Sequence, residues 1–162
     1  MQKVKWGVIS TAKIGLEKVI PAMMTCENAE VIAIASRSVE SAQKVAFRLG
    51  IPKAYGSYEA LLDDVEVEAI YNPLPNHLHV PWTIKALQAG KHVLCEKPIA
   101  LNAHEASLLL DASAQYPHLK LMEAFMYRHT PQWLYAKQKI ADGSIGQLRN
   151  IHSIFSYFNA DP

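Results

Sequence analysis

The sequence lacks several features that would assign it to a specialised class of protein. It has only two cysteines, Cys26 and Cys95, which form no CxxC or CxxH pair, so neither a disulfide framework nor a zinc knuckle is indicated. No run approaches the roughly 18 to 20 apolar residues of a membrane helix, and the start shows no charged-then-apolar leader. The formal net charge is only +1, which favours neither nucleic acid nor an anionic membrane as a partner. We therefore expect a cytoplasmic protein with no nucleic-acid partner and no membrane partner.

Short β-branched runs alternate with helical patterns through most of the 162 residues, and half of the residues are hydrophobic. Strands that are joined by crossover helices form a parallel sheet covered on both faces. We therefore predict an α/β fold with a doubly wound parallel sheet, as in Rossmann-like domains. The predicted strands cover residues 4–10, 30–36, 53–56, 69–74, 92–96 and 119–125, and the predicted helices cover residues 14–25, 38–50, 77–89 and 102–115, with a short helix after Ser57.

Capping residues predict where several of these helices begin and end. Ser38 is typical of an N-cap and Gly50 of a C-terminal cap, while Asn102 with Glu105 resembles a capping box. Pro21 lies inside the first predicted helix and lacks the amide that a regular helix needs there. We therefore expect that helix to be kinked or to restart late.

The alternation changes after residue 125. Thr130 and Pro131 predict an N-cap and first helical residue for a helix closed by Gly143, and residues 146–158 are expected to form one long aromatic strand. That strand would either join the edge of the first sheet or open a second α+β domain. We place a dinucleotide-binding domain at residues 1–125 and the beginning of a second domain at residues 126–162.

The stretch GVISTAKIG joins the first predicted strand to its helix, where a dinucleotide-binding protein keeps its phosphate loop. A G-x-G-x-x-G frame set on residues 10–15 retains only Gly15, with Ser10 and Ala12 in place of the other two glycines. Both replacements are small, and the following helix start offers amides and a partial positive charge to an anion. The loop alone is equally consistent with an ordinary turn. The candidate phosphate-binding residues are Ser10, Thr11, Ala12, Lys13 and Ile14.

The end of the second predicted strand bears on which cofactor would bind. An acidic residue here favours the ribose hydroxyls of NAD, whereas an arginine accommodates the additional phosphate of NADP. The sequence places Ser36, Arg37 and Ser38 at this position, two hydroxyls and a guanidinium that suit a phosphate dianion. We therefore expect NADP rather than NAD. The alternative is that Arg37 is a solvated surface charge and Ser38 only a helix cap.

Two further segments follow buried strands and should reach the same sheet edge. NPLPNHLH follows the strand at residues 69–74, and the Glu96–Lys97–Pro98 turn follows the strand at residues 92–96. Ligands of open α/β sheets bind outside the carboxyl ends of the strands. Charged residues directly after an apolar run are seldom left unpaired, and perturbed ionisable groups gather at functional sites. His77 and His79 form a His-x-His pair, but no further ligands are evident and we expect no metal.

Together, the loop GVISTAKIG, the segment PNHLH, the phrase AGKHVLCEKP and the segment MEAFMYRHTPQW resemble the glucose-fructose oxidoreductase and inositol dehydrogenase family, written Gfo/Idh/MocA. The Ser-Thr-Ala loop, the SR pair after the second strand and FMYR resemble its D-xylose dehydrogenase and dihydrodiol dehydrogenase branch. The resemblance covers essentially the whole chain. It implies a dehydrogenase that transfers a hydride between nicotinamide and a sugar or cyclic diol.

The resemblance also implies roles for individual residues. Lys97 matches the catalytic lysine, which bonds the substrate oxygen and assists proton transfer, and a lysine among apolar residues can have its charge disfavoured for that purpose. Glu96 matches a residue near the nicotinamide ribose, and Pro98 often follows a cis peptide in the family. A structural salt-bridged lysine is the alternative for Lys97. The implied cofactor-binding residues are Leu74, Pro75, Asn76, His79, Glu96, Lys97 and Arg128, the last of them close to the active site.

Family members continue into a second domain, a large and mostly antiparallel sheet that supplies the substrate pocket, a further acid-base pair and an oligomer interface. Residues 126–162 match only its beginning, so the resemblance implies a truncated active site and, for the complete protein, a homo-oligomer. Two alternatives stay open. One is a non-catalytic NADP-binding or sensor module, and the other is an interaction protein that has lost the cofactor.

Overall fold

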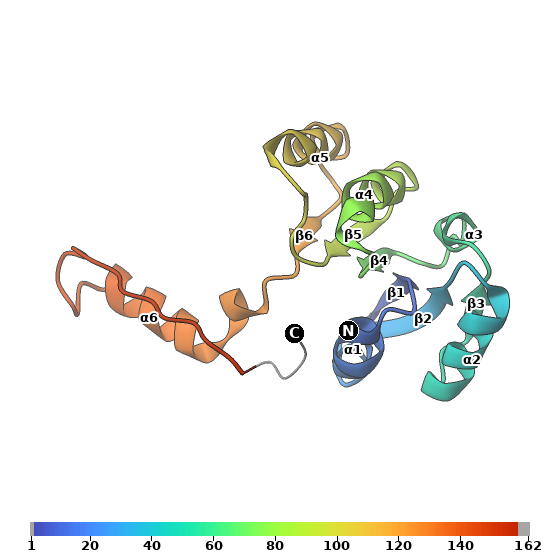
Figure 1. Cartoon of the computed structure of the whole chain (residues 1–162), viewed down its shortest axis with the longest axis horizontal. Helices are drawn as coiled ribbons and strands as arrows, with labels where there is room; N and C mark the ends of the chain where they lie inside the picture. The colour runs from blue at the N-terminus through green and yellow to red at the C-terminus, as the bar shows by residue number, and fades with distance from the viewer. Residues whose placement is uncertain (1, 159–162) are drawn as a thin grey trace. The chain divides into compact units, whose positions relative to one another are not determined.

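The computed structural model describes residues 2–158, which divide after Ala124 into two compact units. The first unit has six parallel strands in the spatial order β3-β2-β1-β4-β5-β6. The strands are β1 Val4–Ile9, β2 Ala29–Ala35, β3 Lys53–Tyr55, β4 Ala69–Asn72, β5 His92–Cys95 and β6 Leu121–Glu123. The chain starts at the centre of the sheet and winds outward in both directions (Figure 1). The predicted doubly wound α/β fold is thus confirmed.

Helices cover both faces of this sheet, and each face has its own apolar core (Figure 1). The helical segments of the first unit are η1 Gly15–Val19, α1 Ile20–Met24, α2 Val39–Leu49, α3 Tyr58–Leu62, η2 Asn76–Leu78, α4 His79–Gln88 and α5 Ala103–Gln115. Helices α3, α4 and α5 pack on one face, where Ile9 is buried, whereas α1 and α2 pack on the other, where Val8 is buried. Both residues are fully buried, so β1 is covered on both sides as a central parallel strand requires.

Local capping chemistry sets the helix boundaries as the sequence predicts. Ser38, Ser57 and Asn102 each accept a hydrogen bond from the backbone amide three residues on, at 3.3, 3.2 and 2.9 Å. These bonds satisfy amides that have no partner inside the helix. Gly50 ends α2 with a φ of 69°, a left-handed conformation that glycine adopts without steric cost.

Pro21 shapes the first helix. The helix opens with the π-helical segment η1, in which the amide of Ile20 donates to the carbonyl of Gly15, five residues earlier. Regular α-helix begins only at Ile20, so Pro21 lies in its first turn, where a missing amide breaks no helical bond. The expected late restart is confirmed, and the π-helical segment is the form that it takes.

The second unit contains a short helix η3 Met126–His129 and a longer helix α6 Pro131–Ala141. Thr130 and Pro131 begin α6 as predicted. The expected strand over residues 146–158 is wrong for the described part of the chain, because that segment has no regular secondary structure there. A strand needs a hydrogen-bonded neighbour, and none of the six strands of the sheet pairs with this segment. Among the described helices, none has both the length and the apolar character needed to cross a membrane.

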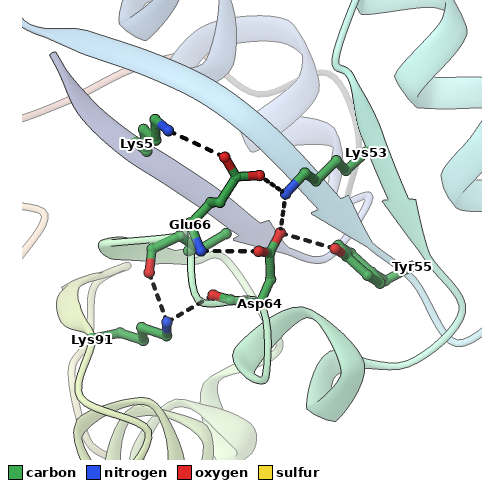
Figure 2. A network of polar contacts seen from close by, with 7 residues as sticks. Lys5, Lys53, Tyr55, Asp64, Glu66 and Lys91 are labelled. Carbon is green, nitrogen blue, oxygen red and sulfur yellow. Dashed lines mark hydrogen bonds and ion pairs between the residues drawn. The ribbon is translucent and has the colours of Figure 1, made fainter.

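An ionic network ties together the segments around the amino ends of the strands, and we call it the amino-edge network (Figure 2). The ammonium of Lys53, at the start of β3, bonds the carboxylate of Asp64 at 2.8 Å and also that of Glu66. The hydroxyl of Tyr55 donates to Asp64 at 2.9 Å. Partial burial opposes ionisation of Asp64, but bonds from Lys53, the Glu66 amide and Tyr55 outweigh it and lower the Asp64 pKa.

Lys91, the residue directly before β5, completes this network. Its side chain is only 7% exposed, and its ammonium donates to the carbonyl oxygens of Asp64 and Val67 at 2.8 and 2.7 Å (Figure 2). Burial lowers the pKa of Lys91, against the weaker opposing effect of nearby aspartates. This network therefore fixes the loop that leads into β4, on the side of the sheet opposite the carboxyl ends of the strands.

Candidate active site

Four loops of the first unit begin at one edge of the sheet. The strands are all parallel, so the chain leaves β1, β2, β4 and β5 at the same edge, at Ser10, Ser36, Pro73 and Glu96. Between β1 and β4 the winding reverses direction, and open α/β sheets bind ligands at this switch point. The structure therefore brings together the loops on which nearly all the candidate residues lie.

The loop after β1 has the form of a phosphate cradle. Ser10 is 9% exposed and has a φ of 156°, a conformation that favours glycine, at the position of the first glycine in the dinucleotide frame. Its hydroxyl accepts a hydrogen bond from the amide of Ala12 at 2.9 Å, which closes a tight turn without glycine. Thr11 and Ala12 are half-buried, whereas Lys13 and Ile14 are exposed.

Gly15 allows the helix after this loop to pack closely on the sheet. A β-carbon placed on Gly15 would lie 3.4 Å from Cε1 of Tyr71 in β4. Close helix-strand packing is the role of the third glycine in the dinucleotide frame. The helical turn that begins at Lys13 therefore starts at the same edge, where its first amides can face an anion.

The residues after β2 are partly committed to helix capping. The hydroxyl of Ser38 accepts from the amide of Ser41 and donates to the carboxylate of Glu40 at 2.6 Å. That bond lowers the pKa of Glu40, so its carboxylate stays ionised beside the capping residue. The Arg37 side chain is exposed, and no hydrogen bond or ion pair engages its guanidinium among the described residues. Ser36 is half-buried next to it.

The backbone at Lys97 is fixed by hydrogen bonds, whereas the side-chain ammonium of Lys97 has no bonding partner among the described residues. The amide of Glu96 donates to the carbonyl of Asn72 at 3.0 Å, and the Lys97 amide lies 3.3 Å from the Glu96 carboxylate. The peptide between Lys97 and Pro98 is cis. The Lys97 side chain is exposed, and its ammonium bonds no other group in the part of the chain that the structure describes. The expectation that Lys97 lies among apolar side chains is therefore wrong in this structure.

Tyr71 supplies the partner that the Glu96 carboxylate needs. Its hydroxyl donates to Glu96 at 2.7 Å, and burial followed by this bond raises the pKa of the Tyr71 phenol far above its usual range. Tyr71 therefore stays a hydrogen-bond donor at neutral pH. The neighbouring Cys95 thiol is fully buried, and burial raises its pKa to about 12, so it is no nucleophile.

The loop after β4 divides into buried and exposed residues. Leu74 is 5% exposed, and its amide donates to the side chain of Asn72, whereas Pro75 and Asn76 are exposed and accessible to a ligand. His79 is only 1% exposed, and both of its ring nitrogens face backbone carbonyl oxygens. The expected cofactor contact of His79 stays a prediction, and both ring nitrogens already face carbonyl oxygens of the protein.

One candidate belongs to the second unit. Arg128 lies in η3 of the second unit and is exposed. No group of three or more metal-ligating side chains occurs within residues 2–158.

Sequence reasoning missed three residues that organise the edge: Tyr71, Asn72 and Glu123. Asn72 is fully buried, and its side chain bonds His79, Thr83 and Leu74. Glu123 accepts a hydrogen bond from the amide of Ile99 at 2.8 Å. The sequence did indicate two of these residues, because a tyrosine and an asparagine inside a fully buried strand need polar partners.

The chemistry available at this edge is acid-base chemistry beside an anion cradle. The turn of Ser10, the close packing of Gly15 and the helix start behind them fit a pyrophosphate, and the free guanidinium of Arg37 fits a further phosphate. The ammonium of Lys97 can donate a proton, and the neutral amine that remains can accept one. The described residues thus fit a dinucleotide with a reacting group near Lys97.

Comparisons with known proteins agree with this geometry. Residues 4–125 match the family described as "Oxidoreductase family, NAD-binding Rossmann fold". The chain is 49% identical to an uncharacterized oxidoreductase, ORF334, of Rhizobium meliloti, over 100% of this chain and 48% of that protein. It is 45% identical to D-xylose 1-dehydrogenase (NADP(+)) 2 of Haloferax volcanii, over 94% of this chain and 46% of the relative.

A solved structure extends the likeness to three dimensions. KijD10, a 3-ketoreductase from Actinomadura kijaniata crystallised with TDP-benzene and NADP, has a TM-score of 0.80 and 38% identity over 90% of this chain and 46% of KijD10. The chain spans about half the length of the curated relatives it matches. Because the family match covers most of the chain, the chain belongs to the Gfo/Idh/MocA oxidoreductase family.

Proposed function

We propose that this chain binds NADP(H) at the carboxyl edge of its sheet and serves a dehydrogenase or reductase that acts on a sugar or cyclic diol. The observation that carries the proposal is the Lys97 turn, in which the backbone is fixed while the ammonium is free at the carboxyl end of β5, one strand from the switch point between β1 and β4. A free, oriented cation at a ligand-binding edge is suited to proton transfer.

The cofactor spans the edge from β2 to β5 in this proposal. Ser10, Thr11, Ala12, Lys13 and Ile14 surround the pyrophosphate, Ser36, Arg37 and Ser38 hold the adenosine 2′-phosphate, and Leu74, Pro75, Asn76 and Glu96 border the nicotinamide end. The free guanidinium of Arg37 favours NADP over NAD. When bound, NADP supplies the hydride acceptor, and NADPH the hydride donor.

Lys97 performs the proton transfer that accompanies hydride transfer. In the oxidative direction its neutral amine takes the proton of the substrate hydroxyl as the carbinol carbon loses hydride, and in the reductive direction its ammonium donates a proton to the carbonyl oxygen. The Tyr71 hydrogen bond to Glu96 keeps the carboxylate beside the lysine in one position. The D-xylose dehydrogenase relative supports a carbohydrate substrate.

The second unit begins a further domain at residues 126–162 in this proposal. Arg128 belongs to the unit with which that domain begins, and the domain would also provide contacts for a homo-oligomer. The support is the length of the relatives, of which the chain spans about half.

The test combines cofactor binding with turnover. The chain and its Lys97→Met variant are titrated with NADPH by fluorescence and then assayed with a panel of aldoses, ketoses and cyclic diols with NADP and NAD. Removing the ammonium should lower kcat about 10²- to 10⁴-fold with little change in NADPH affinity, because the lysine acts on the substrate proton. Lys120→Met is the matched control, since Lys120 is exposed just before β6 at the opposite edge.

Two outcomes would contradict the proposal. Full activity of Lys97→Met would remove the lysine from catalysis, and absence of NADPH binding at millimolar cofactor would favour an interaction protein. Cofactor binding without turnover of any substrate, by a protein that also contains the proposed second domain, would favour the non-catalytic NADP-binding or sensor module.

A further inference from the structure

His79 lies between the two loops that border the proposed nicotinamide end. It is the first residue of α4, and its ring is 1% exposed. Nε2 lies 2.6 Å from the carbonyl oxygen of Leu74, in the loop after β4, and Nδ1 lies 2.7 Å from the carbonyl oxygen of Pro98, directly after Lys97. The ring therefore bridges both loops from behind.

The backbone that carries this ring is itself fixed. Asn72, which is fully buried, donates from its side-chain amide to the carbonyl oxygen of His79 and to the hydroxyl of Thr83, both at 3.2 Å. Buried side chains in such networks have little freedom to move. The backbone from which the ring extends is thus held by β4 and α4.

Pro98 is the residue of this turn that most needs an external bond. Its neighbours are held through their own polar groups, Glu96 by the Tyr71 hydroxyl and Ile99 by the Glu123 carboxylate. Proline has no amide, so the carbonyl is the only backbone group through which Pro98 can be held. His79 makes that contact.

We propose that His79 is the positioning residue of Lys97: the Nδ1–H group donates to the Pro98 carbonyl and thereby fixes the direction in which the lysine leaves the sheet edge. The inference rests on the proposed function of Lys97 in proton transfer. His79 touches neither substrate nor cofactor in this arrangement and acts only through the turn.

Two conservative substitutions separate this role from a general contribution to stability. A neutral imidazole carries one N–H group, which the proposal places on Nδ1. In His79→Asn the side-chain amide can occupy the position of Nδ1 and keep a donor to the Pro98 carbonyl. In His79→Gln it can occupy only the position of Nε2, next to the Leu74 carbonyl, and leaves Pro98 without a donor. Each variant loses one buried contact, so their melting temperatures should fall by similar amounts. Only His79→Gln should release the Lys97 turn.

Two readouts then distinguish the variants. Hydrogen exchange at the Ile99 amide should be at least about tenfold faster in His79→Gln than in the parent chain and little changed in His79→Asn. With a substrate identified from the panel, kcat should fall about 10- to 100-fold in His79→Gln at nearly constant KM for NADPH, since small misplacements of a reacting group cost this much, and His79→Asn should restore most of the rate. His104→Gln, an exposed change on α5, is the control.

The outcomes separate this inference from the proposed function. If the parent chain turns over but both variants lose the same activity and show the same exchange at Ile99, the positioning role is overturned. If a protein that also contains the proposed second domain has no turnover, the proposed function fails, and the exchange pattern still decides whether His79 holds the turn. Should His79→Gln not fold, the ¹⁵N spectrum of the parent imidazole decides, because a slowly exchanging Nδ1–H supports the contact and an unprotonated Nδ1 overturns it.

Discussion

Single residues at the carboxyl edge fall into two groups, those held by other protein groups and those left free. Ser10, His79 and Glu96 are engaged in hydrogen bonds that shape the loops. The charged ends of Arg37 and Lys97 bond no other described side chain. The held residues build a rigid frame, and the free cations are the groups that can exchange solvent for a ligand.

Arg37 gives a prediction at this scale, because the extra phosphate of NADPH is the only group that distinguishes it from NADH. We expect Arg37→Ala to weaken NADPH binding about 10- to 100-fold, the loss of roughly 1.5 to 3 kcal/mol for a charged hydrogen bond, and to leave NADH binding nearly unchanged. Fluorescence titration with both cofactors measures this. Lys120→Ala is the matched control, since Lys120 is exposed just before β6 at the opposite edge and its removal changes the net charge equally. An equal loss for both cofactors, or a parent chain that prefers NADH, would remove the proposed role of Arg37.

The sequence predicts most of the fold at the level of individual helices and strands. Ser38 and Asn102 cap α2 and α5 through bonds to amides three residues away, so the information lies within one turn. The late start of α1 follows from one proline, Pro21. Local chemistry of this kind acts on neighbours in sequence, which is why these boundaries could be predicted.

Features that depend on distant partners could not be predicted. The contact of His79 with Pro98 joins residues 19 apart, and that of Tyr71 with Glu96 joins residues 25 apart. The sequence predicts which loops share the edge but not which side chain holds which carbonyl. The strand expected at residues 146–158 failed for the same reason, since β-propensity does not supply a neighbouring strand.

The amino-edge network gives a prediction at the scale of elements, because it joins the starts of β1, β3 and β5 to the loop before β4 (Figure 2). The folded-state pKa values of Asp64 and Glu66 lie below their usual values of 3.8 and 4.5, for Glu66 chiefly through its bond to Lys53. A depressed carboxyl pKa stabilises the fold above the unfolded value and ceases to do so as pH falls through the folded value.

The free energy of unfolding, measured with urea, should therefore fall as the pH decreases below about 4.5, the usual value for Glu66. Lys53→Met should be less stable than the parent chain at neutral pH, and this difference should shrink in acid as the carboxylates become protonated. Lys85→Met, which breaks the exposed pair with Glu59, is the control and should show a smaller effect. If the difference in unfolding free energy between Lys53→Met and the parent chain does not change with pH, the ionic contacts of Lys53 do not explain it.

The whole molecule combines a first unit with two apolar cores and a second unit whose apolar side chains are largely exposed. The five large apolar residues between 151 and 158 are 71% to 91% exposed, namely Ile151, Ile154, Phe155, Tyr157 and Phe158. Isolated exposed apolar residues are ordinary on protein surfaces, but a run of this density is typical of an interface.

We therefore expect the 162-residue chain to self-associate through this segment, and sedimentation velocity over a range of concentrations measures it. The double variant Ile154→Lys with Phe155→Lys should shift the distribution toward monomer, because two charges in the contact would have to be desolvated. Phe47→Lys is the matched control, since Phe47 is 93% exposed on α2 without a comparable run beside it, and it should leave association unchanged. If the parent chain stays monomeric at every concentration, the predicted self-association through this segment is wrong. Because the amino-edge network and both cores belong to the first unit alone, the double variant should leave its unfolding transition unaltered, which separates a change in association from a loss of fold.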